Sequence, residues 1–391
     1  MYSGREILIW LLPLTAVISW WLGRLSIKRF TSGNLRHIHP DYFKGLNYVL
    51  NEQPDKAIEV FIKMLEVDTE TIETHLALGN LFRRRGEVDR AIRIHQNLIA
   101  RPSLSPEYRD TALMELAMDY MRSGLLDRAE ALFKELVASS AHAHQAYTEL
   151  LDIYQQEKDW DNAISTARKL ETVSGGKLNN VIAQFYCEKA EEVLNAGGRD
   201  TVMENLHKAL SIDPDCARAS LLEGQLLQND GKLKQAIKIY KRIEEQDPEI
   251  LPEAIIPLLT CYRELNAVDE YTEYLREMVS RHGGITAILT LAELKYEKQG
   301  TAEAIRFITT EVKKHPTVKG VDSLLQYVLT QADGSTRESL MSIKELTGRL
   351  LKGRSAYKCN HCGFAAKSLH WYCPSCRSWN TIKPVHGLQG E

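Results

Sequence analysis

The sequence lacks the short motifs that mark several common enzyme classes. It contains no G-x-x-x-x-G-K-[ST] phosphate loop, no G-x-G-x-x-G turn after a strand, no H-E-x-x-H and no G-x-S-x-G. Its histidines show no metal-ligand spacing. These absences argue against nucleotide hydrolysis, dinucleotide-dependent chemistry, zinc peptidase activity and serine hydrolase activity, and we expect a protein that is not an enzyme.

Proline, glycine and cysteine are also scarce over most of the chain. The 391 residues include 12 Pro and 23 Gly, with 44% hydrophobic and 26% charged residues, which excludes a disordered chain. Before residue 350 only Cys187, Cys216 and Cys261 occur, and this odd, unclustered set argues against a disulfide framework. Together with two CxxC pairs further on, it favours a reducing compartment.

The first part of the chain contains a run without charge. Residues 7–23 are 17 uncharged residues with tryptophans near both ends, and as a helix they would reach about 25 Å, the short limit for a bilayer. A buried core helix and a cleaved signal peptide are the alternatives. The segment has neither the basic front nor the small-x-small cleavage site of a signal peptide. We predict an uncleaved transmembrane anchor at residues 1–24.

Acidic residues are absent between residues 7 and 40, while four basic residues follow the predicted span: Arg24, Lys28, Arg29 and Arg36. The positive-inside rule places everything after residue 24 in the cytoplasm. Residues 25–40 are then a basic juxtamembrane linker that can lie against anionic lipid head groups. We therefore expect a single-pass inner-membrane protein with the rest of the chain on the cytoplasmic side.

The middle of the chain repeats one pattern of paired helices. A small residue opens each second helix, and its spacings are 34, 38, 34, 39, 34, 34 and 34 residues along the series Ala57, Ala91, Ala129, Ala163, Val202, Ala236, Glu270 and Ala304. Glu270 is the degenerate member. The two longer spacings coincide with the loops at 101–110 and 174–180. This 34-residue period resembles the tetratricopeptide repeat.

Glycine and proline occupy positions that support this pattern. Gly45, Gly79 and Gly224 let a second helix approach the first, and Gly86, Gly124 and Gly231 suit left-handed helix ends. Pro214, Pro248 and Pro316 follow second helices, which cannot continue through proline. We predict an all-α superhelical solenoid of about eight tetratricopeptide repeats at 41–318, with a groove for partner proteins. An atypical helix pair at 319–352 should cap it.

Four cysteines near the C-terminus have the spacing C-x2-C-x10-C-x2-C: Cys359, Cys362, Cys373 and Cys376. Two CxxC turns can point four thiolates at one ion, and closed four-cysteine sites are usually structural. We predict one structural metal ion, iron or zinc, in a four-cysteine rubredoxin-like or zinc-ribbon module at 353–391. We call these residues the metal module.

The second cysteine pair reads CPSCRS and resembles the C-P-x-C-G of rubredoxin, with Arg377 in place of glycine. That resemblance keeps iron open and makes a redox protein an alternative function. Phe364, Trp371 and Trp379 are expected to cover the metal. Residues 346–390 contain no acid, so nucleic-acid binding is a further alternative, although a protein contact, a membrane contact or the charge of the metal site itself explains the basic residues at least as well.

The order of anchor, repeats and four-cysteine module resembles the lipopolysaccharide assembly protein B family of Gram-negative bacteria. The resemblance implies an inner-membrane adaptor that restrains lipopolysaccharide synthesis. It implies delivery of the lipid A pathway's committed-step deacetylase to a membrane AAA+ zinc protease, and inhibition by a second, regulatory inner-membrane protein. A generic assembly scaffold remains an alternative, and whether the chain forms homo-oligomers stays open.

Overall fold

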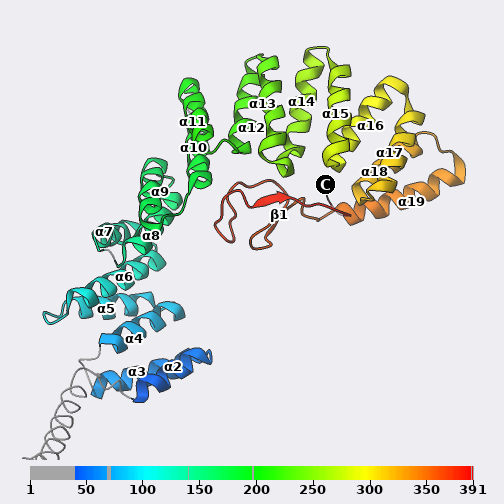
Figure 1. The fold of residues 1–391 in the computed structure, drawn as a ribbon. Helices are drawn as coiled ribbons and strands as arrows, with labels where there is room; N and C mark the ends of the chain where they lie inside the picture. Colours follow the sequence, from blue (N-terminus) through cyan, green and yellow to red (C-terminus); the bar gives the residue numbers. More distant parts are fainter. Residues whose placement is uncertain (1–39, 68–71, 140, 196–197, 389, 391) are drawn as a thin grey trace, which may run out of the picture. The chain divides into compact units, whose positions relative to one another are not determined.

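The computed structural model describes residues 40–67, 72–139, 141–195, 198–388 and 390 (Figure 1). The predicted anchor and nearly all of the basic linker therefore lie outside the described residues. Within the described ranges, no helix has both the length and the apolar character needed to cross a bilayer.

The chain divides into two compact units, residues 1–146 and 147–391. In the described part of the first unit, helices follow one another in antiparallel pairs: α2 (Pro40–Leu50) with α3 (Pro54–Val67), α4 (Ile72–Arg85) with α5 (Val88–Ile99), and α6 (Pro106–Ser123) with α7 (Leu126–Leu136). Helix α8 (Ala143–Glu157) begins just before the boundary between the units.

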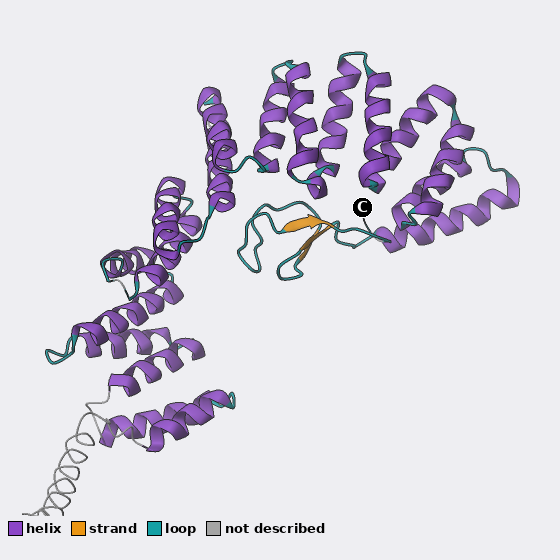
Figure 2. Ribbon diagram, viewed as in Figure 1, coloured by secondary structure: helices purple, strands orange, loops and turns teal. Residues whose placement is uncertain are grey.

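The second unit continues the series and adds a small sheet (Figure 2). Its described helices are α9 (Trp160–Ser174), α10 (Asn179–Asn195), α11 (Arg199–Ile212), α12 (Ala217–Asn229), α13 (Leu233–Gln246), the short η1 (Pro248–Ile250), α14 (Pro252–Glu264), α15 (Val268–His282), α16 (Ile285–Gln299), α17 (Thr301–Lys314), α18 (Val318–Leu329) and α19 (Gly334–Leu351). The predicted solenoid of helix pairs and the atypical last pair, α18 and α19, are both found.

Three first helices end at the glycines that the sequence pattern indicates. Gly86, Gly124 and Gly231 adopt φ of 88°, 76° and 70°, which reverses the chain into the next helix without a clash from a side chain. In other repeats Glu52, Lys158 and Asn266 hold the same left-handed conformation. In these six repeats the left-handed residue precedes the buried opening residue of the second helix by five positions, although the residue type varies. The repeat of Ala304 differs, because its positive-φ residue, Gly300, lies only four positions earlier.

One position of the predicted repeat register is wrong. The other small opening residues are buried at the fourth position of their helix, as Ala57 is in α3 and Ala236 in α13. Glu270 is exposed at the third position of α15, and Tyr271 is the fully buried residue that follows it. The left-handed Asn266 lies five residues before Tyr271, so the repeat is shifted by one residue and a bulky ring replaces the small side chain.

The glycines of the first helices leave room for rings of the second helices. A Cβ atom added at Gly45 would lie 2.6 Å from the Phe61 ring, and one added at Gly224 would lie 2.5 Å from the Tyr240 ring. Both distances are shorter than carbon atoms tolerate. In each case the ring belongs to a residue that is at most 1% exposed, so the glycine and the ring together determine how closely the paired helices approach.

The metal module begins after α19 and forms a three-stranded antiparallel sheet in the order β2-β1-β3. The strands are β1 (Tyr357–Cys359), β2 (Ala365–Ala366) and β3 (Ile382–Pro384). Lys358 of β1 pairs with Ala365 on one side and Lys383 on the other. The central strand therefore ends at the first cysteine, and β2 begins two residues after Gly363, which closes the turn that carries Cys362.

Candidate metal centre

Two short turns carry the four cysteines, and the two turns share one backbone geometry. In the first, Gly363 donates its backbone N–H to the Cys359 carbonyl at 2.9 Å; in the second, Arg377 donates to the Cys373 carbonyl at the same distance. Gly363 and Arg377 both have positive φ, 80° and 57°. Gly363 readily adopts this left-handed conformation, and Arg377 adopts it at the position where a glycine would be the usual choice.

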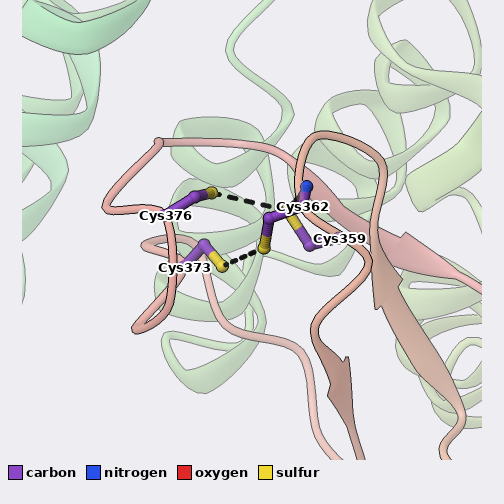
Figure 3. A group of neighbouring side chains, drawn as sticks. All are labelled: Cys359, Cys362, Cys373 and Cys376. Atoms are coloured by element: carbon purple, nitrogen blue, oxygen red, sulfur yellow. Dashed lines mark hydrogen bonds between the residues drawn. The ribbon is translucent and has the colours of Figure 1, made fainter. Parts of the chain in front are cut away.

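The four sulfur atoms converge on one point (Figure 3). All lie within 4.8 Å of one another, and the Sγ–Sγ distances are 3.7 Å both between Cys359 and Cys376 and between Cys362 and Cys373. A tetrahedron of thiolates about 2.3 Å from a zinc ion has edges of about 3.8 Å. The cysteines therefore fit a single tetrahedral ion, with each close pair joining one turn to the other.

The surroundings favour the thiolate form of Cys376. Hydrogen bonding with Ser378, and next with His361, lowers the pKa of the Cys376 thiol to about 5. Cys359 and Cys373 are buried, whereas Cys362 is exposed. Because thiolate is the form that binds metal, Cys376 is suited to the role of a ligand.

The expectation that three aromatic side chains cover the metal holds only in part. Phe364 packs in the apolar cluster of Cys359, Cys373 and Ile382. Trp371 instead packs against the apolar cluster of α12 to α16. Trp379 donates its indole N–H to Gln155 of α8 at 2.7 Å, and its ring makes edge contacts with Trp160 and Phe185. The tryptophans attach the module to the helices, so covering the metal is the wrong interpretation for them.

Polar contacts attach the module at further points of the second unit. The Tyr357 hydroxyl donates to Glu253 of α14 at 2.5 Å, and Lys383 forms an ion pair with Asp247. The Arg377 guanidinium lies 2.7 Å from Asp152 of α8. Two cations of the acid-free segment are thus paired with carboxylates of the helices, which accounts for part of its basic composition.

Nothing in the sequence indicated that these helix residues contact the metal module. Asp152, Gln155, Asp247 and Glu253 are ordinary polar residues of helices or turns, and nothing in the repeat pattern separates them from neighbouring polar positions. One signal did exist on the module side. Arg377 replaces the glycine of the rubredoxin pattern, and a residue that accepts a left-handed conformation usually has a contact that compensates for it.

Family models agree with both parts of the structure. A model described as "Rubredoxin metal binding domain" matches residues 357–384, and models described as "Tetratricopeptide repeat" match residues 74–107 and 114–175. The chain is also similar to a crystal structure of a tetratricopeptide repeat protein from Parabacteroides merdae, at 13% identity and a TM-score of 0.32, over 79% of this chain and 97% of that one.

Curated relatives extend the similarity to nearly the whole chain. Lipopolysaccharide assembly protein B of Escherichia coli (strain K12) is 39% identical over 386 residues, which are 98% of this chain and 99% of that protein. The protein of the same name from Haemophilus influenzae is 39% identical over 392 residues, 97% of this chain and 98% of that protein. Identity of this extent, with the paired helices and the four-cysteine module in the same chain, shows that the chain belongs to the lipopolysaccharide assembly protein B family.

Proposed function

We propose that this protein is a non-enzymatic adaptor that regulates lipopolysaccharide synthesis at the cytoplasmic face of the inner membrane. The observation that carries the proposal is the attachment of the metal module to the helical array. Side-chain contacts join residues separated by as many as 225 positions, as in the pair Arg377 and Asp152. A rigid surface assembled from distant repeats suits the binding of other proteins, and the relatives' name supplies the lipopolysaccharide context.

The proposed metal ligands are all four cysteines of the two turns: Cys359, Cys362, Cys373 and Cys376. One zinc or iron ion held there would supply structural stabilisation, because a closed four-thiolate site leaves no open position for a substrate. Backbone hydrogen bonds of the module maintain the two turns. Its side chains bury Cys359 and Cys373 and contact the helices. Metal binding would in this way be part of the folding free energy of the module.

Residues 1–24 are proposed to anchor the adaptor, with residues 25–40 as its basic linker. Residues 41–318 would form the repeats, 319–352 the capping pair and 353–391 the metal module. A tether confines the bound partners to one membrane plane and raises their effective concentration. The adaptor would in this way deliver the committed-step deacetylase of lipid A synthesis to a membrane AAA+ zinc protease, and a second inner-membrane protein would inhibit it.

Reconstitution tests this proposal directly. Purified deacetylase and protease are placed in lipid nanodiscs with or without the full-length chain, and the half-life of the deacetylase is measured. We expect a shorter half-life with the chain present, and a smaller effect from a chain lacking residues 1–30 at the same concentration. An unchanged half-life, with both partners active in control assays, would contradict the adaptor proposal.

A further inference from the structure

Two cysteines outside the metal module lie against each other in the second unit. The Sγ atoms of Cys187 and Cys216 are 3.9 Å apart, although the residues are 29 positions apart in the sequence. Cys187 lies in the interior of α10, and Cys216 directly precedes α12, so the contact joins the first helices of two neighbouring repeats. The third cysteine outside the module, Cys261, is fully buried in α14 and has no such contact among the described residues.

The two thiols differ in how readily a reagent can reach them. Cys187 is 0% and Cys216 is 2% exposed. Cys216 follows two exposed turn residues, Pro214 and Asp215, and the end of a helix opens at a lower free energy than its interior. Opening of this one turn exposes Cys216, whereas exposure of Cys187 requires α10 itself to unfold. Cys216 is therefore the thiol that a small reagent reaches first.

The surroundings of Cys216 favour the thiolate form. Its Sγ accepts a hydrogen bond from the Gln184 side-chain amide at 3.6 Å. Hydrogen bonding with Cys187, and also with the backbone N–H of Ala219 in the first turn of α12, lowers the pKa of the Cys216 thiol despite its burial. Burial raises the pKa of Cys187. Because the thiolate is the nucleophilic form of cysteine, Cys216 is suited to attack an oxidant and Cys187 to react afterwards.

Buried polar side chains connect the cysteine pair to the metal module. The amide nitrogen of Gln184 donates to Cys216, and its amide oxygen accepts a hydrogen bond from the Arg218 guanidinium at 3.2 Å. Arg218 is 3% exposed, and its guanidinium lies 5.8 Å from the centre of the Trp371 ring of the module. Cys216 also precedes Arg218 by only two residues. A displacement of Cys216 therefore alters the position of a side chain against which Trp371 lies.

From these features we propose that Cys187 and Cys216 form a disulfide when the chain meets a hydroperoxide, and that this disulfide weakens the attachment of the metal module. Disulfides that form in reducing compartments are usually transient and serve catalysis or redox sensing. A pair that is reduced at rest and oxidised under peroxide stress agrees with this rule. The proposal adds a regulatory input to the chain and does not depend on which protein the adaptor binds.

The reaction with hydrogen peroxide consists of two displacements. In the first, the Cys216 thiolate attacks one peroxide oxygen, an S–O bond forms, the O–O bond breaks, and the departing hydroxide takes up the thiol proton as water. In the second, the Cys187 sulfur attacks the sulfur of the Cys216 sulfenic acid, the S–S bond forms, the S–O bond breaks, and hydroxide leaves with the Cys187 proton as a second water. The two thiols lose two electrons and two protons, and the peroxide is reduced to water.

Formation of the disulfide requires a movement of the two helices. The sulfur atoms must approach from 3.9 Å to about 2 Å, which draws α10 and the start of α12 together. The Cys216 sulfur then no longer carries the negative charge that favours the hydrogen bond from Gln184. Both changes act on the residues that position Arg218, and we therefore expect the contact between Arg218 and Trp371 to weaken.

The test uses the purified full-length chain in detergent, loaded with zinc and treated with hydrogen peroxide in the absence of added thiols. Mass spectrometry of alkylated peptides is expected to find Cys187 joined to Cys216, with Cys261 still alkylated and zinc still bound. In the oxidised chain, residues 369–379 should lose hydrogen-exchange protection, while the helical circular dichroism is retained. Reduced glutathione should restore both the thiols and the protection.

Three alanine variants separate the roles of the cysteines. Cys187→Ala should leave the Cys216 sulfenic acid unresolved, so that dimedone labels it, and Cys216→Ala should yield neither the sulfenic acid nor the disulfide. Both variants should keep the exchange protection of residues 369–379 under peroxide. Cys261→Ala is the matched control, because it alters a cysteine of the next repeat that is also fully buried, and it should oxidise like the wild type.

The wild-type measurements alone can overturn the inference. It is wrong if Cys187 and Cys216 stay reduced while peroxide oxidises the metal ligands, or if their disulfide appears only after denaturant has unfolded the array. It is also wrong if the disulfide forms in the folded chain and the exchange of residues 369–379 does not change, because the pair would then have no effect on the module.

Discussion

The helical array and the metal module stabilise their folds by different means. In the array, each helix pair buries apolar side chains against its neighbours, and the cluster that runs from Ala217 to Leu294 extends over several repeats. The module has strands of two or three residues and a cluster of only three buried residues, two of which are cysteines. A core of this size cannot stabilise a fold alone, so the module depends on its ligand set and on the array.

Removing metal ligands should affect the metal module strongly and the helical array little. This is the largest difference that we expect between the two regions. In the variant Cys359→Ser with Cys362→Ser, we expect metal loss, loss of hydrogen-exchange protection at residues 357–384 and loss of the regulatory effect in cells. The helical circular dichroism should change little, because the array has its own core. Metal content, exchange and deacetylase level are the measurements.

The control for this variant is Ser375→Ala, which changes an exposed residue between the cysteines of the second turn and should alter none of the three measurements. A double-serine variant that is verified as metal-free, yet regulates the deacetylase normally, would show that the metal has no part in the function.

A second prediction perturbs the array without touching the metal. Gly224→Ala places a Cβ atom 2.5 Å from the Tyr240 ring, and we expect a local destabilisation of about 1–3 kcal/mol from overpacking. Gly348→Ala is the matched change in α19, where no atom lies within 4 Å of the added Cβ. It should stabilise its helix by about 0.5–1 kcal/mol.

Hydrogen exchange of the two helices measures both effects, and metal content should stay at the wild-type value in each variant. Destabilisation of similar size by the two substitutions would mean that helix–helix approach at Gly224 does not govern local stability.

The smallest expected effect concerns the junction between the regions. Arg377→Gly removes the half-exposed ion pair with Asp152, which contributes about 1 kcal/mol or less, and also relieves a left-handed conformation that costs a non-glycine residue about 1–2 kcal/mol. The terms oppose each other, so the unfolding free energy should change by less than about 1 kcal/mol. Calorimetry with metal titration measures it; a large loss of metal affinity would assign Arg377 to the site itself.

Sequence reasoning predicted the array and the four-cysteine site because both depend on local, periodic signals. The helix pairs recur with a 34-residue spacing, and each CxxC turn closes within a few residues. The register at Tyr271 was missed because a ring replaced the small side chain while the charged Glu270 occupied the expected spacing. The left-handed Glu52 and Lys158 carry no residue-type signal, since the backbone conformation there is imposed by helix packing.

The attachment of the module to the array could not be predicted for a different reason. It joins Trp379 to Gln155, 224 residues apart, through side chains that any exposed helix could carry. Judged from the sequence alone, the same tryptophan fits equally well the role of a cover for the metal. Only the three-dimensional path of the chain distinguishes the two roles.

The long-range contacts of the module also affect how the second unit unfolds and folds. Repeat arrays usually open from their ends, because each repeat interacts only with its neighbours. Here the backbone N–H of Val318, at the start of α18, donates to the carbonyl of Leu388 at 2.9 Å, while Trp379 holds α8. These cross-links couple repeats that are not neighbours. Unfolding should therefore be more cooperative in the second unit than in a simple array, and docking of the module should be a late, slow step that follows helix formation.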